Sequence, residues 1–290
     1  MKPAAFEYHA PDSLEEALAL LSDHGDDAKV LAGGQSLIPA MNFRIAQPGV
    51  LIDLNRIRAL AFIEKDENKN LRLGAMARQS QIETNAVVKN FAPLLCETMP
   101  FIAHVQIRNR GTIGGSLAHA DPAAELPAVM LALEAELGLK SQSRARWVAA
   151  KDFFVGMFAT ALAAGELLAE IRVPALAPRS GWAFEEFARR HGDYALAGVA
   201  AVITLAEDGS CAKARIALLS VGDGPVLAAQ AGQSLLGQKI TEQTLTEAAK
   251  IAANQDIDPG GDIHASANFR RHLAQVLTER ALRRAWARAA

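Results

Sequence analysis

A chain of 290 residues, with 50% hydrophobic and 21% charged side chains, is long enough to build two domains with extensive cores. Its 30 basic and 32 acidic residues give a formal net charge of −2, which provides no bulk attraction to nucleic acid or to an anionic membrane. The two cysteines, Cys96 and Cys211, lie outside any C-x-x-C motif, which excludes a zinc site, a dithiol centre or a four-thiolate iron–sulfur cluster. Without a leader or a membrane-spanning apolar run, we expect a soluble, cytoplasmic protein.

The first part of the chain predicts alternating strands and helices. Ser13 begins a helix and Glu16 follows three residues later, which is the pattern of a capping box. Gly25 is placed to end that helix, because glycine tolerates the left-handed conformation found after a helix. Strands are expected at residues 6–8, 28–32 and 50–53.

The middle and last parts predict different mixtures of elements. In the middle part, hairpins are expected at residues 62–73 and 135–149, helices at 79–85, 92–102 and 123–133, and a strand at 167–173. From Gly181 onward, the pattern predicts three antiparallel strands at 182–188, 195–206 and 212–221, and helices at 228–236, 245–254 and 266–288. The order indicates a sheet that packs on a small helical bundle.

Two glycine-rich segments are the candidates for chemistry. One runs from Leu31 to Leu37 and reads Leu-Ala-Gly-Gly-Gln-Ser-Leu, and the other runs from Asn109 to Pro122 and contains Gly-Gly-Ser. Two such runs, each just beyond an apolar strand, suit a diphosphate, because glycine lets backbone N–H groups approach an anion closely. The alternative is that each run is an ordinary tight turn. Neither run has the Rossmann or P-loop spacing, so a dinucleotide would be bound by another fold.

Longer motifs around these segments resemble the FAD-binding medium subunits of molybdenum hydroxylases, the family of aerobic carbon monoxide dehydrogenase and xanthine dehydrogenase. The matching motifs are residues 32–44, 108–127, 153–157, 166–168 and 187–200. The resemblance implies an α+β fold with two FAD-binding subdomains of the vanillyl-alcohol-oxidase (PCMH) type, at residues 1–59 and 60–177. It also implies a C-terminal domain at residues 178–290, with a three-stranded antiparallel sheet and a helical bundle.

The resemblance also implies which residues hold FAD. Backbone amides of Gly33, Gly34, Gln35, Ser36 and Leu37 would hold one side of the diphosphate, and Thr112, Gly114, Gly115 and Ser116 the other, so bulky side chains at Gly34 or Gly114 would block binding. Glu125 would accept ribose hydroxyls, although an acid in the first turn of a helix is an equal alternative. Leu168 would pack on adenine or remain plain strand core. The other implied cofactor contacts are Val30, Leu31, Ala32, Ile102, Ile113, Ala118, Asp121 and Glu185.

Tyr194, and three residues already named, bear on chemistry and specificity. Tyr194 occupies the family position beside the isoalloxazine ring, where it would shield or gate the flavin, and a half-buried strand tyrosine is the alternative. Glu185 stands where relatives carry lysine near the flavin, and Gln35 where many carbon monoxide dehydrogenase-like subunits carry histidine, which argues against carbon monoxide as substrate. Asp121 before Pro122 is expected to cap a helix, and no metal site is expected from its neighbours.

The resemblance implies a division of labour among subunits. A large subunit with molybdopterin would hydroxylate the substrate, and a small subunit with [2Fe–2S] clusters would relay the electrons. This chain would collect them on FAD and pass them to an external acceptor, within a dimer of heterotrimers. The alternatives are a free-standing FAD-dependent oxidoreductase and a nucleotide-binding assembly module without turnover.

Overall fold

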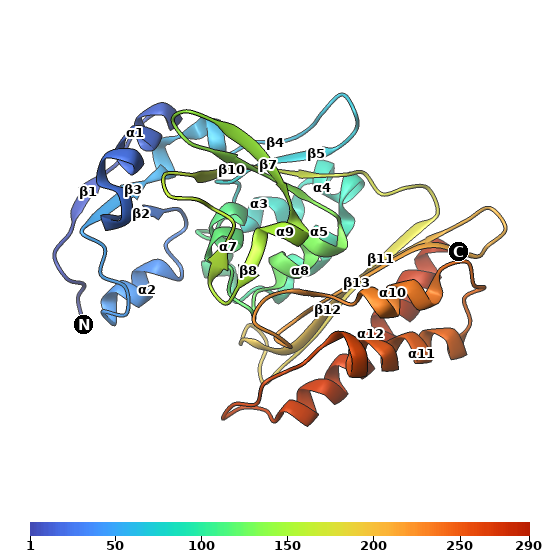
Figure 1. The fold of residues 1–290 in the computed structure, drawn as a ribbon. Helices are drawn as coiled ribbons and strands as arrows, with labels where there is room; N and C mark the ends of the chain where they lie inside the picture. Colours follow the sequence, from blue (N-terminus) through green and yellow to red (C-terminus); the bar gives the residue numbers. More distant parts are fainter.

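The N-terminal lobe is a small parallel sheet covered by a helix. In the computed structural model, which describes residues 1–290, strands β1 (Glu7–His9), β3 (Val50–Asp53) and β2 (Ala28–Leu31) pair in that order, and α1 (Leu14–His24) packs on them (Figure 1). The Ser13 hydroxyl accepts the Glu16 N–H at 3.1 Å, but the Glu16 carboxylate accepts the Asp12 N–H instead of that of Ser13. The predicted capping box is therefore only half formed. Gly25, at φ 52°, ends the helix as predicted.

The middle lobe contains a five-stranded antiparallel sheet and most of the short helices. The strand order is β4 (Ile63–Lys65), β5 (Leu71–Gly74), β10 (Leu167–Val173), β6 (Glu136–Lys140) and β7 (Ala145–Ala149), which confirms both predicted hairpins. The helices are α3 (Gln79–Thr84), α4 (Ala86–Phe91), α5 (Pro93–Thr98), α6 (Val105–Arg108), α7 (Ile113–His119), α8 (Glu125–Ala132) and α9 (Ala150–Phe153). The short helix α2 (Leu37–Asn42) of the N-terminal lobe and a two-stranded ribbon of the middle lobe, β8 (Phe154–Gly156) with β9 (Ala159–Thr160), belong to these lobes as well. They are completed by 3-10 turns at Gly25–Asp27, Leu54–Arg56, Arg58–Leu60 and Met99–Phe101.

Two expectations for the middle lobe were wrong. The helix expected over residues 92–102 is α5 followed by a 3-10 turn, and α4 precedes it, capped by the Asn85 side chain, which accepts the Val87 and Val88 N–H groups. The second glycine-rich run does not follow a strand. It comes after α6 and forms the first turns of α7, because the Thr112 hydroxyl caps that helix by accepting the Gly115 N–H at 3.0 Å.

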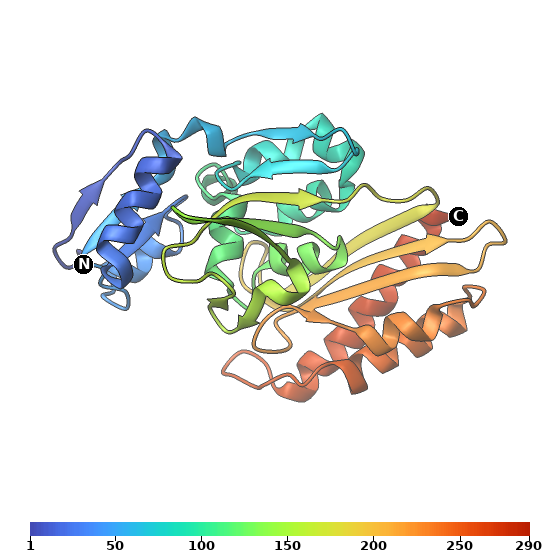
Figure 2. The same cartoon turned by 45° about the horizontal axis from the view of Figure 1, so that its top comes forward.

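The C-terminal lobe packs one sheet against three helices. Strands β11 (Ser180–Ala188), β12 (Ala195–Leu205) and β13 (Cys211–Leu219) are antiparallel as predicted, but a two-residue strand, β14 (Val226–Leu227), adds a fourth. The helices are α10 (Ala229–Leu235), α11 (Glu242–Ile251), continued by a π turn at Ala252–Asp256, and α12 (Ala267–Ala289). Figure 2 shows the long strands lying between α12 and the helices of the middle lobe.

The seam between the middle and C-terminal lobes is continuous hydrophobic core. Phe184 and Val202 of the sheet belong to the same buried cluster as Leu126 and Val129 of α8. Ala183, the neighbour of Phe184, belongs instead to the cluster beneath α12. Successive residues of β11 thus face opposite sides of the sheet, as the period of a strand requires. No helix of the structure has the length and apolar character needed to cross a membrane.

Candidate functional site

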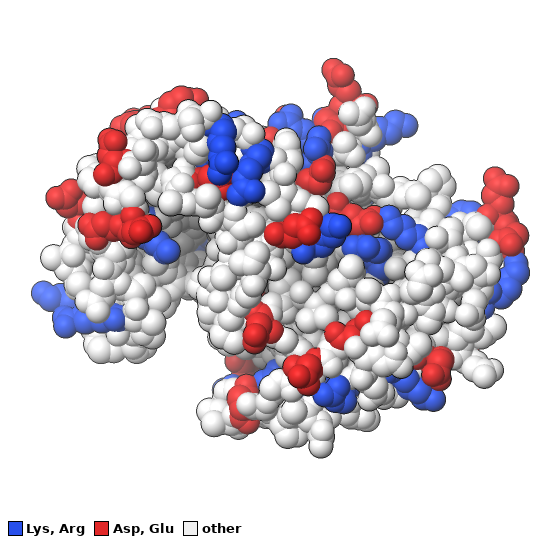
Figure 3. All heavy atoms as spheres, in the orientation of Figure 1, with Lys and Arg blue, Asp and Glu red and all other residues white.

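The two glycine-rich runs meet where the N-terminal and middle lobes face each other. A Cβ added to Gly33 would lie 2.5 Å from the Arg110 carbonyl oxygen, and one added to Gly115 would lie 3.3 Å from the Ala32 Cβ. Only glycine at position 33 permits this approach, because real Cβ atoms do not come within that distance of a backbone oxygen. Figure 3 shows the surface hollowed between the two lobes in this region.

The first run is a stretch of backbone donors without acceptors. None of the five consecutive N–H groups from Gly33 to Leu37 donates a hydrogen bond within the chain. Gly34 has φ +72°, and the Gln35 side-chain amide folds back to donate to the Gly33 carbonyl at 3.0 Å. Ser36 is exposed and Leu37 begins α2, so their N–H groups are unpaired as at any helix start, whereas Gly33, Gly34 and Gln35 are buried or half-buried. Consecutive free donors that lead into a helix N-terminus form a concave site suited to an anionic ligand.

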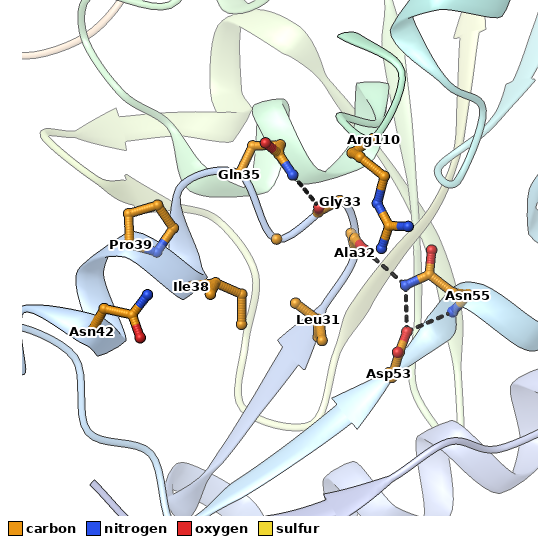
Figure 4. A pocket seen from close by; sticks show the side chains of 11 residues that line it. Leu31, Ala32, Gly33, Gln35, Ile38, Pro39, Asn42, Asp53, Asn55 and Arg110 are labelled. Carbon is orange, nitrogen blue, oxygen red and sulfur yellow. Dashed lines mark hydrogen bonds between the residues drawn. The ribbon is translucent and has the colours of Figure 1, made fainter. Parts of the chain in front are cut away.

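A pocket of about 310 Å³ opens beside this run (Figure 4). Besides the predicted residues Leu31, Ala32, Gly33, Gly34 and Gln35, its lining includes Ile38, Pro39, Asn42, Asp53, Asn55 and Arg110. The Asn55 side chain donates to the Ala32 carbonyl at 2.9 Å, and Asp53 accepts the Tyr8 hydroxyl at 2.6 Å. Sequence reasoning missed Asp53 and Asn55. Their signal was available, since Asp53 ends and Asn55 follows β3, which runs parallel to β2, and parallel strands end at the same edge.

Two guanidinium groups stand close to each other beside the pocket. Arg78 donates to the Arg110 carbonyl and to the Asn55 side-chain oxygen. Burial lowers the pKa of Arg78, and the nearby positive charge of Arg110 lowers it further. Two neighbouring cations favour a ligand with more than one negative charge.

The second run differs from the first because several of its backbone N–H groups are already hydrogen-bonded within the chain. The N–H groups of Ile113 and Gly114 donate to the carbonyls of Ala77 and Ala75 at 3.0 and 2.9 Å, and that of Gly115 is taken by Thr112. A Cβ at Gly114 would lie 2.4 Å from the Ala75 Cβ. The Gly114 N–H is therefore not free to hold the diphosphate as expected, and this glycine instead lets α7 pack on the chain beneath it. The partly exposed Ser116 remains as the hydroxyl of this run.

Asp121 and Glu125 lie between the second run and the C-terminal lobe. Asp121 does not cap α8 as expected. Its side chain accepts the Ala123 N–H at 2.9 Å and closes a turn, and α8 begins at Glu125 with Ala124 as its cap. Glu125 is 8% exposed and makes no hydrogen bond to another residue, and burial, with a smaller contribution from Asp121, raises its pKa to about 7.

Tyr194 and the two glutamates of β11 lie on the C-terminal lobe. Tyr194 is 70% exposed and directly precedes β12, so it is not a half-buried strand residue. Partial burial raises its pKa, and the charges of Asp121 and Glu125 add to the effect. Glu185 forms an ion pair with Arg284 of α12, on the face of the sheet turned away from the glycine-rich runs. This ion pair argues against the implied contact of Glu185 with the cofactor.

Glu186, one residue further on, faces the other way. Its Oε2 atom is buried without a hydrogen-bond partner, and burial together with the charge of Glu125 raises its pKa to about 9. Sequence reasoning did not single out Glu186, because the face of the sheet to which each residue of β11 points is set by the register of β11 with β12.

The remaining predicted residues lie outside the lining of the pocket. Leu168 is 4% exposed in the core of the middle lobe, so its side chain is strand core. Ile102 is 8% exposed, and its carbonyl accepts an N–H of Arg108 at 3.0 Å. Val30 lies in β2, and Ala118 is exposed on α7.

Comparisons with known proteins agree across the whole chain. Residues 4–176 match the family model for the FAD binding domain in molybdopterin dehydrogenase, and residues 182–285 match that for the CO dehydrogenase flavoprotein C-terminal domain. The chain is 45% identical to the 6-hydroxypseudooxynicotine dehydrogenase complex subunit alpha of Paenarthrobacter nicotinovorans, covering 100% of this chain and 97% of that protein. It is 43% identical to the caffeine dehydrogenase subunit beta of Pseudomonas sp. (strain CBB1), covering 98% and 96%.

A solved structure gives the same answer for the fold. Carbon monoxide dehydrogenase from Hydrogenophaga pseudoflava contains a chain that is 42% identical and superposes with a TM-score of 0.96 over 100% of both chains. This confirms the predicted α+β fold with an FAD-binding part and a C-terminal domain. The chain belongs to the FAD-binding medium subunits of the molybdenum hydroxylase family.

Proposed function

We propose that the chain holds FAD in the cleft between the N-terminal and middle lobes, with the diphosphate on the run from Gly33 to Leu37. The five unpaired N–H groups of this run are the observation that carries the proposal. Arg110 in the pocket lining and the adjacent Arg78 supply positive charge for the phosphates. The donors and charges present therefore fit the group.

The second run offers fewer free backbone N–H groups to the cofactor than its sequence suggests. Ser116 would donate its hydroxyl to the cofactor, while the N–H groups of Ile113 and Gly114 stay committed to the middle lobe. Glu125 would accept hydroxyls of the sugar part, and Tyr194, exposed at the edge of the C-terminal lobe, would cover the ring. Leu168 would contribute through its backbone only.

Within an assembled enzyme, the chain would pass electrons from its FAD to an external acceptor. FAD supplies the redox chemistry, since it accepts electrons singly and releases them in pairs. The electrons would come from the [2Fe–2S] clusters of a small partner subunit, after a large molybdopterin subunit has oxidised the substrate, and they would leave to an external acceptor. The names of the relatives, which are subunits of dehydrogenases, support this arrangement over a free-standing oxidoreductase.

The site assignment is tested by a matched pair of glycine variants. Gly34 and Gly237 both have φ +72°, so Gly34→Ala and Gly237→Ala carry the same backbone strain of about 1–2 kcal/mol. Only Gly34 lies in the unpaired run, and a Cβ there would meet Ile38 at 3.1 Å, whereas Gly237 faces open space.

Flavin is released from each purified protein and quantified by chromatography and visible absorbance. We expect stoichiometric FAD in the wild type and in Gly237→Ala, and a loss in Gly34→Ala. Equal FAD content in both variants would refute the assignment. Turnover of substrate by the chain without partner subunits would favour the free-standing oxidoreductase.

A further inference from the structure

A closed circuit of contacts joins the N-terminal and middle lobes at the first glycine-rich run. The Asn55 side chain donates an N–H to the Ala32 carbonyl at 2.9 Å (Figure 4), and its oxygen accepts an N–H from Arg78. Arg78 donates a second N–H to the Arg110 carbonyl. That carbonyl oxygen is the atom nearest to a Cβ added at Gly33, so the circuit starts at Ala32 and returns to its neighbour. We call these side-chain hydrogen bonds of Asn55 and Arg78 the clasp.

The clasp is anchored on the N-terminal lobe at the end of β3. Asn55 lies in the 3-10 turn Leu54–Arg56, and Asp53, the last residue of β3, accepts the Asn55 backbone N–H at 2.8 Å. Asp53 also accepts the hydroxyl of Tyr8 from β1 at 2.6 Å. Because β3 pairs in parallel with β2, and β2 leads into the first run, Asn55 lies beside that run at the same edge of the sheet.

On the middle lobe the clasp is anchored to the second glycine-rich run. The backbone of Arg78 forms a β-bridge with Thr112, and its neighbour Gln79 donates an N–H to the Gly111 carbonyl at 3.0 Å. The Arg78 side chain binds the Arg110 carbonyl of the same segment. Arg78 is therefore fixed to the second run, and its guanidinium reaches across to the other lobe.

The clasp is separate from the apolar packing that joins the two lobes. Met76, Leu167 and Ala169 of the middle lobe belong to the buried cluster of the N-terminal lobe. Neither residue of the clasp is part of a buried cluster, since Asn55 is exposed and Arg78 is half-buried. Removal of a clasp side chain should therefore leave both lobes folded and joined, while it releases the first run at the cleft.

We propose that Asn55 and Arg78 are positioning residues, which hold the first run in its diphosphate-binding shape before FAD binds. The inference rests on the proposed function. Two adjacent glycines give the run more conformational freedom than other residues would, and ordering such a segment on binding weakens affinity. The clasp orders the segment during folding, because Ala32 is held through its carbonyl and Gly33 is seated against Arg110.

Arg78 acts in this role through the geometry of its N–H groups. A guanidinium is a planar fork that donates in two directions, whereas the ammonium of lysine is a point charge that does not reproduce this fork. Both acceptors, the Asn55 amide oxygen and the Arg110 carbonyl, are neutral, so they require the fork more than the charge. Arg78→Lys therefore separates the two properties, because it keeps the positive charge beside the phosphates and loses the clasp.

The first test measures the FAD affinity of the full chain by flavin titration. The proteins are the wild type, Asn55→Ala, Arg78→Ala, Arg78→Lys and the variant that combines both alanine substitutions. Arg271→Ala is the matched control, because Arg271 also donates to two carbonyls, those of Ala253 and Ile257, but in the C-terminal lobe.

We expect each single clasp variant to bind FAD about three- to tenfold more weakly than the wild type, and Arg271→Ala to bind it equally well. The combined variant should be no more than about twofold weaker than the weaker single variant, because the two side chains belong to one circuit. Fully additive losses would mean that each side chain contacts FAD independently. Wild-type affinity in Arg78→Lys would mean that only the charge matters. Either result would overturn the inference.

Limited proteolysis without FAD reports the order of the run itself. Thermolysin cuts before large apolar residues, and Leu37 at the end of the run is such a site. We expect faster cleavage there in the clasp variants than in the wild type and Arg271→Ala. Equal cleavage rates in proteins that bind FAD would overturn the inference and leave the proposed function intact. A wild-type chain that takes up no FAD would overturn both.

Discussion

Replacing Glu186 by glutamine should make the protein more stable than the wild type at high pH, by a margin that grows as the pH rises. The pKa of Glu186 is raised from 4.5 to about 9 in the folded protein. Such a group contributes stability that is fully present below its unfolded pKa and is lost as the pH rises through the folded pKa, because unfolding then releases a proton. Each pH unit in this window removes about 1.4 kcal/mol from the free energy of unfolding.

The magnitude is large enough to measure. Between about pH 6 and about pH 8, Glu186 alone should lower the wild-type free energy of unfolding by about 2–3 kcal/mol, out of a typical total of about 5–15 kcal/mol. Glutamine has nearly the same shape and does not titrate, so Glu186→Gln should lack this decline. Urea denaturation of the two proteins at several pH values measures the difference directly.

The control and the refuting result follow from the same geometry. Glu185→Gln loses an ion pair with Arg284, so its curve should lie below that of the wild type with the same slope against pH. Parallel curves for the wild type and Glu186→Gln would show that Glu186 is ionised in the folded protein. The reasoning from burial and from the unpaired Oε2 would then be wrong.

Three further substitutions test other parts of the structure. Gly114→Ala should lower the free energy of unfolding in urea by about 1–3 kcal/mol, because its Cβ would lie 2.4 Å from that of Ala75. Arg284→Ala removes a partly exposed link from α12 to Glu97 of α5, so a loss of about 1 kcal/mol that shrinks at high salt is expected in the same assay. Asn55→Ala leaves the Ala32 carbonyl without its donor at 2.9 Å, and an FAD affinity about three- to tenfold weaker is expected by flavin titration. Unchanged values would contradict each of these assignments.

Local sequence was sufficient to locate many of the elements. β3 and β10 have the predicted bounds, and both predicted hairpins are present, because apolar runs between polar turns specify strands from nearby residues alone. The run at residues 33–37 was found in the same way, since the adjacent glycines Gly33 and Gly34 are visible in the sequence. Resemblance to a known family then supplied the fold as a whole.

Tertiary structure decided what each residue of the site does. Gly33 and Gly114 look alike in sequence, but the first approaches Arg110 at the cleft and the second packs on Ala75 in the interior. In the second run, the N–H groups of Ile113 and Gly114 donate to the carbonyls of Ala77 and Ala75. These acceptors lie more than thirty residues away in the chain. Local patterns cannot report such pairings.

The clearest division concerns Glu185 and Glu186. The sequence determined that two acids stand together on one strand. Only the register of β11 with β12, and the packing of the sheet between α8 and α12, decided that Glu185 meets Arg284 while Glu186 is buried without a partner. Because side chains alternate along a strand, a shift of one residue would exchange the two roles. Long-range packing therefore decides which of the two glutamates faces Arg284.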